Sequence, residues 1–230
     1  DCAFMMELVQ ELIGEAAKAI VGSLRFEYQG QAIDLSPPWD RVSFAEAMEG
    51  MGLTPRSSLE EIQAALHRKG MQVAGLNRSQ LVRLVEQLFE PKTKAKPLFV
   101  VDYWTELSPL ARAKPDDPLI TERFELFIGG LEVANAFSEL NDPIEQRRRF
   151  EAQLGQATSS KLQAAEKNTK GLQPAACSRM IDESFIEALE YGMPPAGGLG
   201  VGVDRLAMLL LNQPSIKDVI LFPLLKPTQE

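Results

Sequence analysis

The chain has 230 residues, of which 45% are hydrophobic, and this length and composition predict one domain or one domain with an insertion. Its formal net charge of −8 argues against a free-standing nucleic-acid-binding protein, which would be basic. The two cysteines, Cys2 and Cys177, are far apart and form no metal or redox motif, and no apolar run is long enough for a membrane span. We therefore expect a reduced, cytoplasmic protein with no membrane partner.

The chain is predicted to open with a helix and a strand pair. Apolar residues at helical spacing predict a helix over residues 5–21. A strand pair over residues 24–34 has Gly30 at its turn, and Pro37 and Pro38 keep the following segment extended.

Capped helices are predicted next. Ser43 and Ser57 each precede a glutamate by three residues, which is the spacing of a capping box, and Asn77 or Ser79 can begin a third helix. The helices of residues 53–95 are expected to form a small insertion, in which we identify no catalytic chemistry. A continuous apolar run directly after it predicts a buried strand.

The segment ERFELFIGGLEVANAFSEL is predicted to form a β-hairpin. Two apolar-rich runs flank Gly129 and Gly130, and a two-residue Gly-Gly link favours the tight turns that hairpins need. With this turn, residue 125 faces residue 134. Glu125 and Glu132 then lie on the same face as diagonal neighbours, within roughly 7 Å of each other.

The two glutamates of the hairpin can be explained in two ways. Like charges this close repel each other, and a divalent cation between them would remove the repulsion. Mg²⁺ suits such a site because it is often bound by one or two carboxylates together with substrate phosphates. In the alternative explanation, Glu125 and Glu132 are solvated side chains on an exposed face.

Asn135, Phe137 and Glu139 follow at a spacing of two, so they share one face of the second strand. An amide, a ring and a carboxylate on one face would suit a ligand that has an ammonium group. In a straight strand this face is opposite to that of Glu132. A single pocket therefore requires a β-bulge between Glu132 and Asn135.

Two more helices and a final strand are predicted after the hairpin. Asp142 and Asp182 are expected to cap the helices, and the basic run at residues 147–149 is interpreted as the solvated side of the first one rather than an RNA site. The polar residues 156–176 predict a surface helix or a partly disordered segment. The apolar residues 219–222 predict a short strand.

A glycine-rich strand is predicted over residues 197–203. Glycine weakens a strand, so four glycines there indicate close approach by another group, such as an adenine ring or a substrate backbone. Arg205 follows at the start of an apolar helix. This position can bind a phosphate, and it can equally form a structural salt bridge with an acidic neighbour.

These segments resemble the catalytic domain of class II lysyl-tRNA synthetases. The similarity is carried by the hairpin, by ESFIEALEYGMPPAGGLGVGVDR with the following LAMLLLNQPSIKDVILFPLLKP, and by the segments DLSPPWDR and DYWTELSPLA. The glycine strand and its arginine resemble the family's motif 3. One departure is Trp104, because proline usually precedes the threonine at that point in the family.

The resemblance implies an α+β fold, in which a mostly antiparallel sheet carries the site and helices flank it. It also implies a lysine–tRNA ligase, which activates lysine with ATP and Mg²⁺ and passes it to tRNA without a covalent side-chain nucleophile. Glu125 and Glu132 would hold Mg²⁺ and thereby ATP, and Arg205 would contact the γ-phosphate. The lysine site would be formed by Asn135, Phe137, Glu139 and Gly200.

The resemblance covers essentially the whole chain but begins after motif 2. We therefore expect a catalytic-domain fragment over residues 1–230 that lacks motif 1, motif 2 and the anticodon-binding domain, is inactive alone, and belongs to a homodimer at full length. One alternative is a ligase that attaches a lysine-like amino acid to an elongation factor, in which alanine is typical at the Gly200 position. Another is a non-catalytic paralogue that binds lysine or a nucleotide.

Overall fold

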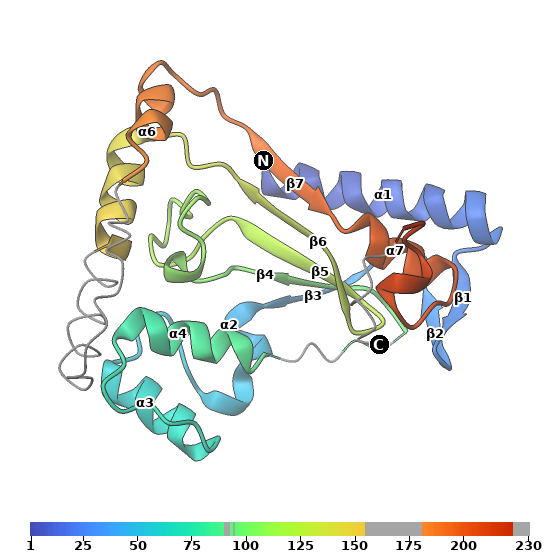
Figure 1. Cartoon of the computed structure of the whole chain (residues 1–230), viewed down its shortest axis with the longest axis horizontal. Coiled ribbons are helices and arrows are strands. Elements are labelled where there is room, and N and C mark those ends of the chain that lie inside the picture. The colour runs from blue at the N-terminus through green and yellow to red at the C-terminus, as the bar shows by residue number, and fades with distance from the viewer. Residues whose placement is uncertain (90–92, 94, 155–180, 223–230) are drawn as a thin grey trace, which may run out of the picture.

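The computed structural model describes residues 1–89, 93, 95–154 and 181–222, so the prediction for residues 156–176 falls outside the described residues. A central sheet holds five strands among them, in the order β3 (Asp40–Ser43), β4 (Leu98–Val101), β5 (Arg123–Ile128), β6 (Leu131–Ser138) and β7 (Gly197–Val201) (Figure 1). β3 runs parallel to β4, and the other neighbouring pairs are antiparallel. The expected α+β fold with a mostly antiparallel sheet is confirmed.

One face of the sheet is covered by α1 (Cys2–Val21), which begins at the side-chain cap Asp1 and ends at Gly22 with φ 78°. The helix buries Val9, Ile13 and Ala17 in a hydrophobic core. α7 (Val203–Leu210) and the antiparallel pair β1 (Arg25–Tyr28) and β2 (Gln31–Asp34) contribute to the same core. None of the described helices, α1 included, is long and apolar enough to cross a bilayer.

The other face is covered in part by the helices of residues 44–87, of which those after residue 53 belong to the predicted insertion. α2 (Phe44–Ala47), the 3-10 turn η1 (Glu49–Met51), α3 (Leu59–Arg68) and α4 (Arg78–Gln87) lie together on one side of the sheet (Figure 1). Phe89, just after α4, packs on Phe127 of β5 with ring centroids 5.6 Å apart. The second hydrophobic core therefore lies on the face of β5 that carries Phe127.

The helix caps of this region follow the sequence with one shift. Ser43 forms a capping box as predicted, and of the two predicted starts Asn77 rather than Ser79 caps α4. α3, however, begins after Ser58 rather than Ser57. Both serines precede a glutamate by three residues, so the spacing alone did not distinguish them. The Ser57 hydroxyl is used in the preceding turn, where it accepts a hydrogen bond from the Thr54 N–H at 3.0 Å.

The central hairpin contains a β-bulge. Phe127 pairs with Glu132 as the Gly-Gly turn predicts, but Glu125 pairs with Asn135, so the predicted pairing of residue 125 with residue 134 is wrong. Val133 is the extra residue, because the next rung toward the turn after Leu126–Ala134 is Phe127–Glu132. Two consecutive buried residues mark the bulge, since Val133 is 1% exposed and Ala134 is 3% exposed.

The helix after the hairpin covers residues 143–154 and follows the cap Asp142, as predicted. Its basic run is only partly solvated, which corrects the interpretation of residues 147–149 as a solvated surface. The Arg149 side chain is 8% exposed and donates from Nη1 to the carbonyls of Ser108 at 3.3 Å and Ala111 at 2.7 Å. These bonds tie the helix to the loop that follows η2 (Thr105–Leu107).

The end of the described chain differs from the prediction. α6 (Glu183–Glu190) is capped by Asp182 as expected, but the predicted strand at residues 219–222 is wrong. A single turn, η3 (Ile216–Asp218), forms just before it, with the Ser215 hydroxyl accepting from the Lys217 N–H. A strand needs a neighbouring strand for its hydrogen bonds, and the described residues place none beside 219–222.

Candidate active site

The bulge in β6 brings the predicted site residues onto one face of the sheet. Directly opposed residues of neighbouring strands share a face, and Asn135 lies between Glu125 of β5 and Gly200 of β7. Glu132 lies opposite Phe127, which is two residues from Glu125 along β5. The two glutamates are therefore diagonal neighbours on this face, as predicted, and the amide lies on the same face.

Phe137 and Glu139 continue this face toward the end of β6. Both are partly exposed, whereas the alternate residues Ala136 and Ser138 are buried on the other side. Phe137 pairs with Gly198 of β7, and the Glu139 carboxylate lies so close to Gly198 that a Cβ atom there would overlap its Oε1. Burial raises the pKa of Glu139.

Glu125 is held from two sides. Its side chain is 14% exposed; the Tyr103 hydroxyl donates to its Oε2 at 2.6 Å, and Arg123 donates from Nη2 to its Oε1. Burial raises the pKa of Glu125, while the positive charge of Arg123 and the Tyr103 hydrogen bond act in the opposite direction. Burial also raises the pKa of Tyr103, which keeps this hydroxyl a donor.

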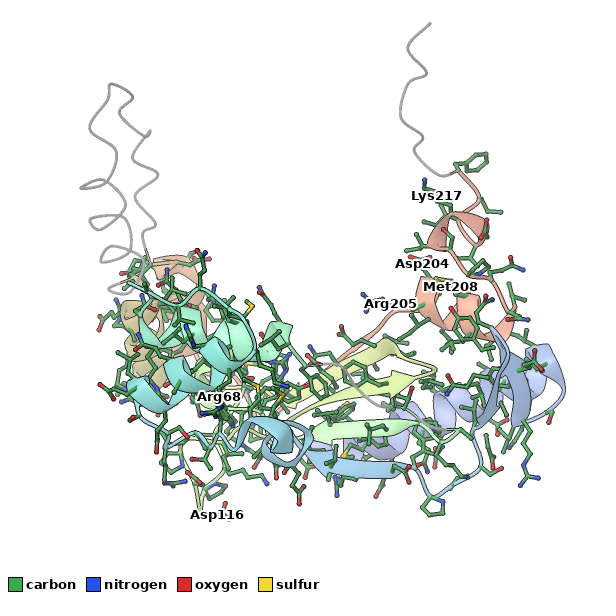
Figure 2. The ribbon with its side chains drawn as sticks, turned by 90° about the horizontal axis from the view of Figure 1, so that it is seen from below. Arg68, Asp116, Asp204, Arg205, Met208 and Lys217 are labelled. Carbon is green, nitrogen blue, oxygen red and sulfur yellow. The ribbon has the colours of Figure 1, made fainter. Side chains whose placement is uncertain are left out.

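Glu132 is paired with the arginine at the start of α7. Arg205 Nη1 lies 2.8 Å from the Glu132 carbonyl oxygen and 3.3 Å from Glu132 Oε2. The two side chains are 48% and 39% exposed, so the ion pair is of the weak, solvated kind. Figure 2 shows Arg205 extending from α7 out over the sheet. A salt bridge is thus present, and its weakness leaves the guanidinium available to a stronger anion.

Gly200 leaves open space beside the amide. It is exposed, and among the described atoms an added Cβ would meet only the Asn135 carbonyl oxygen, at 3.7 Å. That distance is an ordinary van der Waals contact, so the backbone does not require glycine at this position. A side chain there would take up space next to Asn135 on the face that carries the glutamates.

The structure adds three residues that the sequence analysis did not assign to the site. Arg123 and Tyr103 bind Glu125 directly, and Glu86 of α4 lies near enough to Arg123 and Glu125 to be affected by their charges. α4 therefore contributes a carboxylate to the border of this face. Arg123 had a sequence signal, because it precedes Glu125 by two residues and so shares its face, whereas the position of Glu86 depends on how α4 packs.

The site suits a metal only when substrate supplies further ligands. Within the described part of the chain, no group of three or more His, Cys, Asp or Glu side chains is arranged to hold a metal ion. Glu125 and Glu132 provide two carboxylates on one face, which is the protein share that Mg²⁺ commonly takes when phosphates complete its coordination. The donor set therefore fits Mg²⁺ bound together with a nucleotide.

A family model described as class II tRNA synthetases (D, K and N) matches residues 1–226. The chain belongs to this family of ligases. The resemblance inferred from the hairpin and the glycine strand is thereby confirmed.

Curated relatives of the chain include lysine–tRNA ligases of several bacteria. The chain is 46% identical over 235 residues to lysine–tRNA ligase of Pelotomaculum thermopropionicum and 42% identical over 235 residues to that of Moorella thermoacetica. It is 44% identical over 233 residues to lysine–tRNA ligase of Synechococcus sp. (strain CC9902). These matches cover 99–100% of this synthetase chain but only 43–45% of the relatives. The chain thus spans less than half the length of the relatives it matches.

Proposed function

We propose that this chain forms the part of a lysine–tRNA ligase that binds lysine and Mg²⁺–ATP. The observation that carries the proposal is the bulge in β6. It puts the acidic pair, Glu125 and Glu132, on the same face as Asn135, Phe137 and Glu139. The similarity to lysine–tRNA ligases supports lysine as the amino acid. We further propose tRNA as acceptor, a homodimer at full length, a cytoplasmic location, and residues 53–95 as an insertion in the catalytic domain.

In this proposal the acidic pair and the arginine serve the nucleotide. Glu125 and Glu132 hold Mg²⁺, which neutralises phosphate charge when it is bound. Arg205 exchanges its weak contact with Glu132 for the γ-phosphate, since a phosphate offers a full charge and several acceptors. Glu125 needs no rearrangement, because Arg123 and Tyr103 already fix its carboxylate.

The remaining residues serve the amino acid. Glu139 pairs with the ammonium group of lysine, Phe137 packs on its alkyl chain, and Gly200 leaves room beside the substrate. The lysine carboxylate is then free to attack the α-phosphate of ATP, with formation of the adenylate and release of pyrophosphate. Side chains of this chain contribute alignment and charge, and none is required as a nucleophile.

The proposal is tested by lysine-dependent ATP–pyrophosphate exchange. The assay compares the 230-residue chain with a chimera, in which this chain replaces the matching segment of the Pelotomaculum relative. We expect exchange with lysine and not with arginine in the chimera, and none in the chain alone. Exchange by the chain alone would show that the part of the relatives that this chain does not match is dispensable for exchange. Lysine or nucleotide binding without exchange in the chimera would favour a non-catalytic paralogue.

Two substitutions in the chimera separate the halves of the site. Glu132→Gln is expected to weaken Mg²⁺–ATP binding by about 10–100-fold, because the metal loses a charged ligand. Glu139→Ala is expected to reduce lysine binding by a similar factor while ATP binding changes little. Calorimetric titration with each ligand measures both effects. Unchanged ATP affinity in the first variant would exclude the metal role, and equal losses in the second would indicate collapse of the fold.

A further inference from the structure

Arg123 is a nearly buried cation whose part in the proposed function is so far only to hold Glu125. Its side chain is 11% exposed at the start of β5, on the face that carries the site. Four of the five guanidinium N–H donors have named acceptors: the Leu107 carbonyl at 3.1 Å, Ser108 Oγ at 2.9 Å, Glu125 Oε1, and Asn135 Oδ1 at 3.3 Å.

The Arg123 guanidinium is held by a contact of its flat face with an aromatic ring as well as by the hydrogen bonds of its N–H groups. Its central carbon lies 4.4 Å from the centre of the Tyr103 ring, a cation–π contact. The acceptor Ser108 is itself fixed, because the buried Arg149 donates to its carbonyl oxygen. Upstream, Glu106 of η2 forms a salt bridge with Arg78 of α4 at 2.6 Å. The arginine is therefore anchored to a loop that two other elements hold in place.

The two acceptors on the sheet belong to different halves of the site. Glu125 is assigned to Mg²⁺ and the nucleotide, and Asn135 is assigned to lysine. They are also opposed residues in neighbouring strands, so a planar guanidinium can reach both at once. The amide of Asn135 uses its oxygen for Arg123, which turns its nitrogen away from the arginine.

We propose that Arg123 is a positioning residue that fixes Glu125 and Asn135 relative to each other and so aligns the nucleotide half of the site with the lysine half. The proposal rests on the function proposed above. Arg123 itself touches neither substrate. It acts through the two side chains that do, and a planar fork is required because a lysine ammonium presents only a single point of charge.

The test uses the chimera, with the affinities for lysine and for Mg²⁺–ATP measured separately. Arg123→Met is expected to weaken both by about 10–100-fold, as removal of a residue that orients a ligand-binding side chain usually does. Arg123→Lys is expected to recover part of the nucleotide affinity, because the charge beside Glu125 remains, but not the lysine affinity. Arg148→Met is the control, since that arginine is 75% exposed on a surface helix.

Double-mutant cycles distinguish positioning from a general structural role. If Arg123 acts through Asn135, then Arg123→Met added to Asn135→Ala costs no further lysine affinity. If Arg123 only stabilises the fold, the two losses multiply. Multiplying losses, or wild-type affinities in Arg123→Met, would overturn the proposal. Should the methionine variant fail to fold, Arg123→Lys decides, because unchanged affinity for both ligands would overturn the proposal equally.

The failure of this inference can be told apart from failure of the proposed function. A chimera that binds both substrates, with an Arg123→Met variant that binds them equally well, would refute the positioning role alone. A chimera that binds neither lysine nor Mg²⁺–ATP would refute the proposed function and the positioning role together.

Discussion

Gly198 and Gly200 of β7 are two residues apart, yet a side chain would meet different surroundings at each. At Gly198 a Cβ would overlap the Glu139 carboxylate, so the proposed lysine-binding group depends on glycine there. At Gly200 a Cβ would meet only a carbonyl oxygen of Asn135 at 3.7 Å among the described atoms. A side chain at Gly198 would thus displace the Glu139 carboxylate, whereas a side chain at Gly200 would enter open space that the proposed function assigns to lysine.

Gly200→Ala should therefore separate substrate binding from stability. We expect the KM for lysine to rise by about tenfold or more, because one added methyl group occupies substrate space, with an unchanged melting temperature. Gly198→Ala is the matched comparison and should lower lysine affinity by displacing the Glu139 carboxylate. The melting temperature should change little there too, because the displaced group is the end of a flexible side chain. Exchange assays and thermal unfolding of the chimera measure these effects. A normal KM in Gly200→Ala would show that lysine does not approach this strand.

The residues of the proposed site could be named from the sequence, but most of the residues that contact them could not. Glu125 and Glu132 could be placed on one face because the Gly-Gly turn sets the first rungs of the hairpin. Asn135 could be joined to them only on the condition of a bulge, since nothing in the residue types of β6 says which one is extra. Tyr103 and Glu86 reach the site through tertiary packing. Such contacts cannot be predicted from the spacing of residues along the sequence.

The insertion helices affect the site by bringing a carboxylate to its edge. Phe89 packs on Phe127, and this contact places α4 over the face that carries Glu125. Burial raises the pKa of Glu86 on α4. A carboxyl group with a raised pKa in the folded state favours unfolding above that pKa, and the penalty disappears once the pH is below the unfolded value.

Glu86→Gln is accordingly expected to stabilise the protein in a pH-dependent way. The melting temperature should rise by about 2 °C at neutral pH, and this gain should vanish below the usual glutamate pKa near 4.3. Thermal unfolding across that pH range measures the difference. Glu7→Gln, an exposed change on α1, serves as control. A gain of equal size in acid would mean that packing, rather than charge burial, is responsible.

The accuracy of the predicted helices and strands depended on how local their determinants are. α1, α2 and α4 follow from apolar spacing and caps, which act within a few residues. The segment at residues 219–222 was predicted as a strand from its apolar residues, but Leu221 and Phe222 are about 90% exposed because no strand lies beside them among the described residues. Strand formation depends on a partner, and composition does not reveal one.

Several large apolar side chains in the described part of the chain are exposed rather than packed on the sheet. α1 exposes an outer stripe of Phe4, Leu8 and Leu12, which are 57%, 38% and 44% exposed. β7 has a strand neighbour on one side only among the described residues. An apolar helical stripe and an open strand edge both favour association with another chain.

We therefore expect the isolated 230-residue chain to self-associate or to be only marginally stable. Sedimentation velocity over a wide range of protein concentration should show a mass that increases with concentration. The double substitution Leu8→Glu and Leu12→Glu should reduce this association, whereas Glu7→Gln beside the stripe should not. A chain that sediments as a monomer at every concentration and unfolds in one cooperative transition would contradict this expectation.

The single extra residue in β6 decides on which face of the sheet the later side chains of the strand lie. An unbulged pairing that kept Val133 would set Ala134 opposite Glu125 and turn Asn135 and Phe137 toward the face that α1 covers. Deletion of Val133, in contrast, would leave Ala134 opposite Leu126 and Asn135 opposite Glu125, on their present faces. Most substitutions at residue 133 would leave every later side chain on its present face. Variants of this strand should consequently tolerate changes of residue type at position 133, and even its deletion, better than an insertion or deletion after Ala134, because the latter would reverse the faces of the side chains that follow.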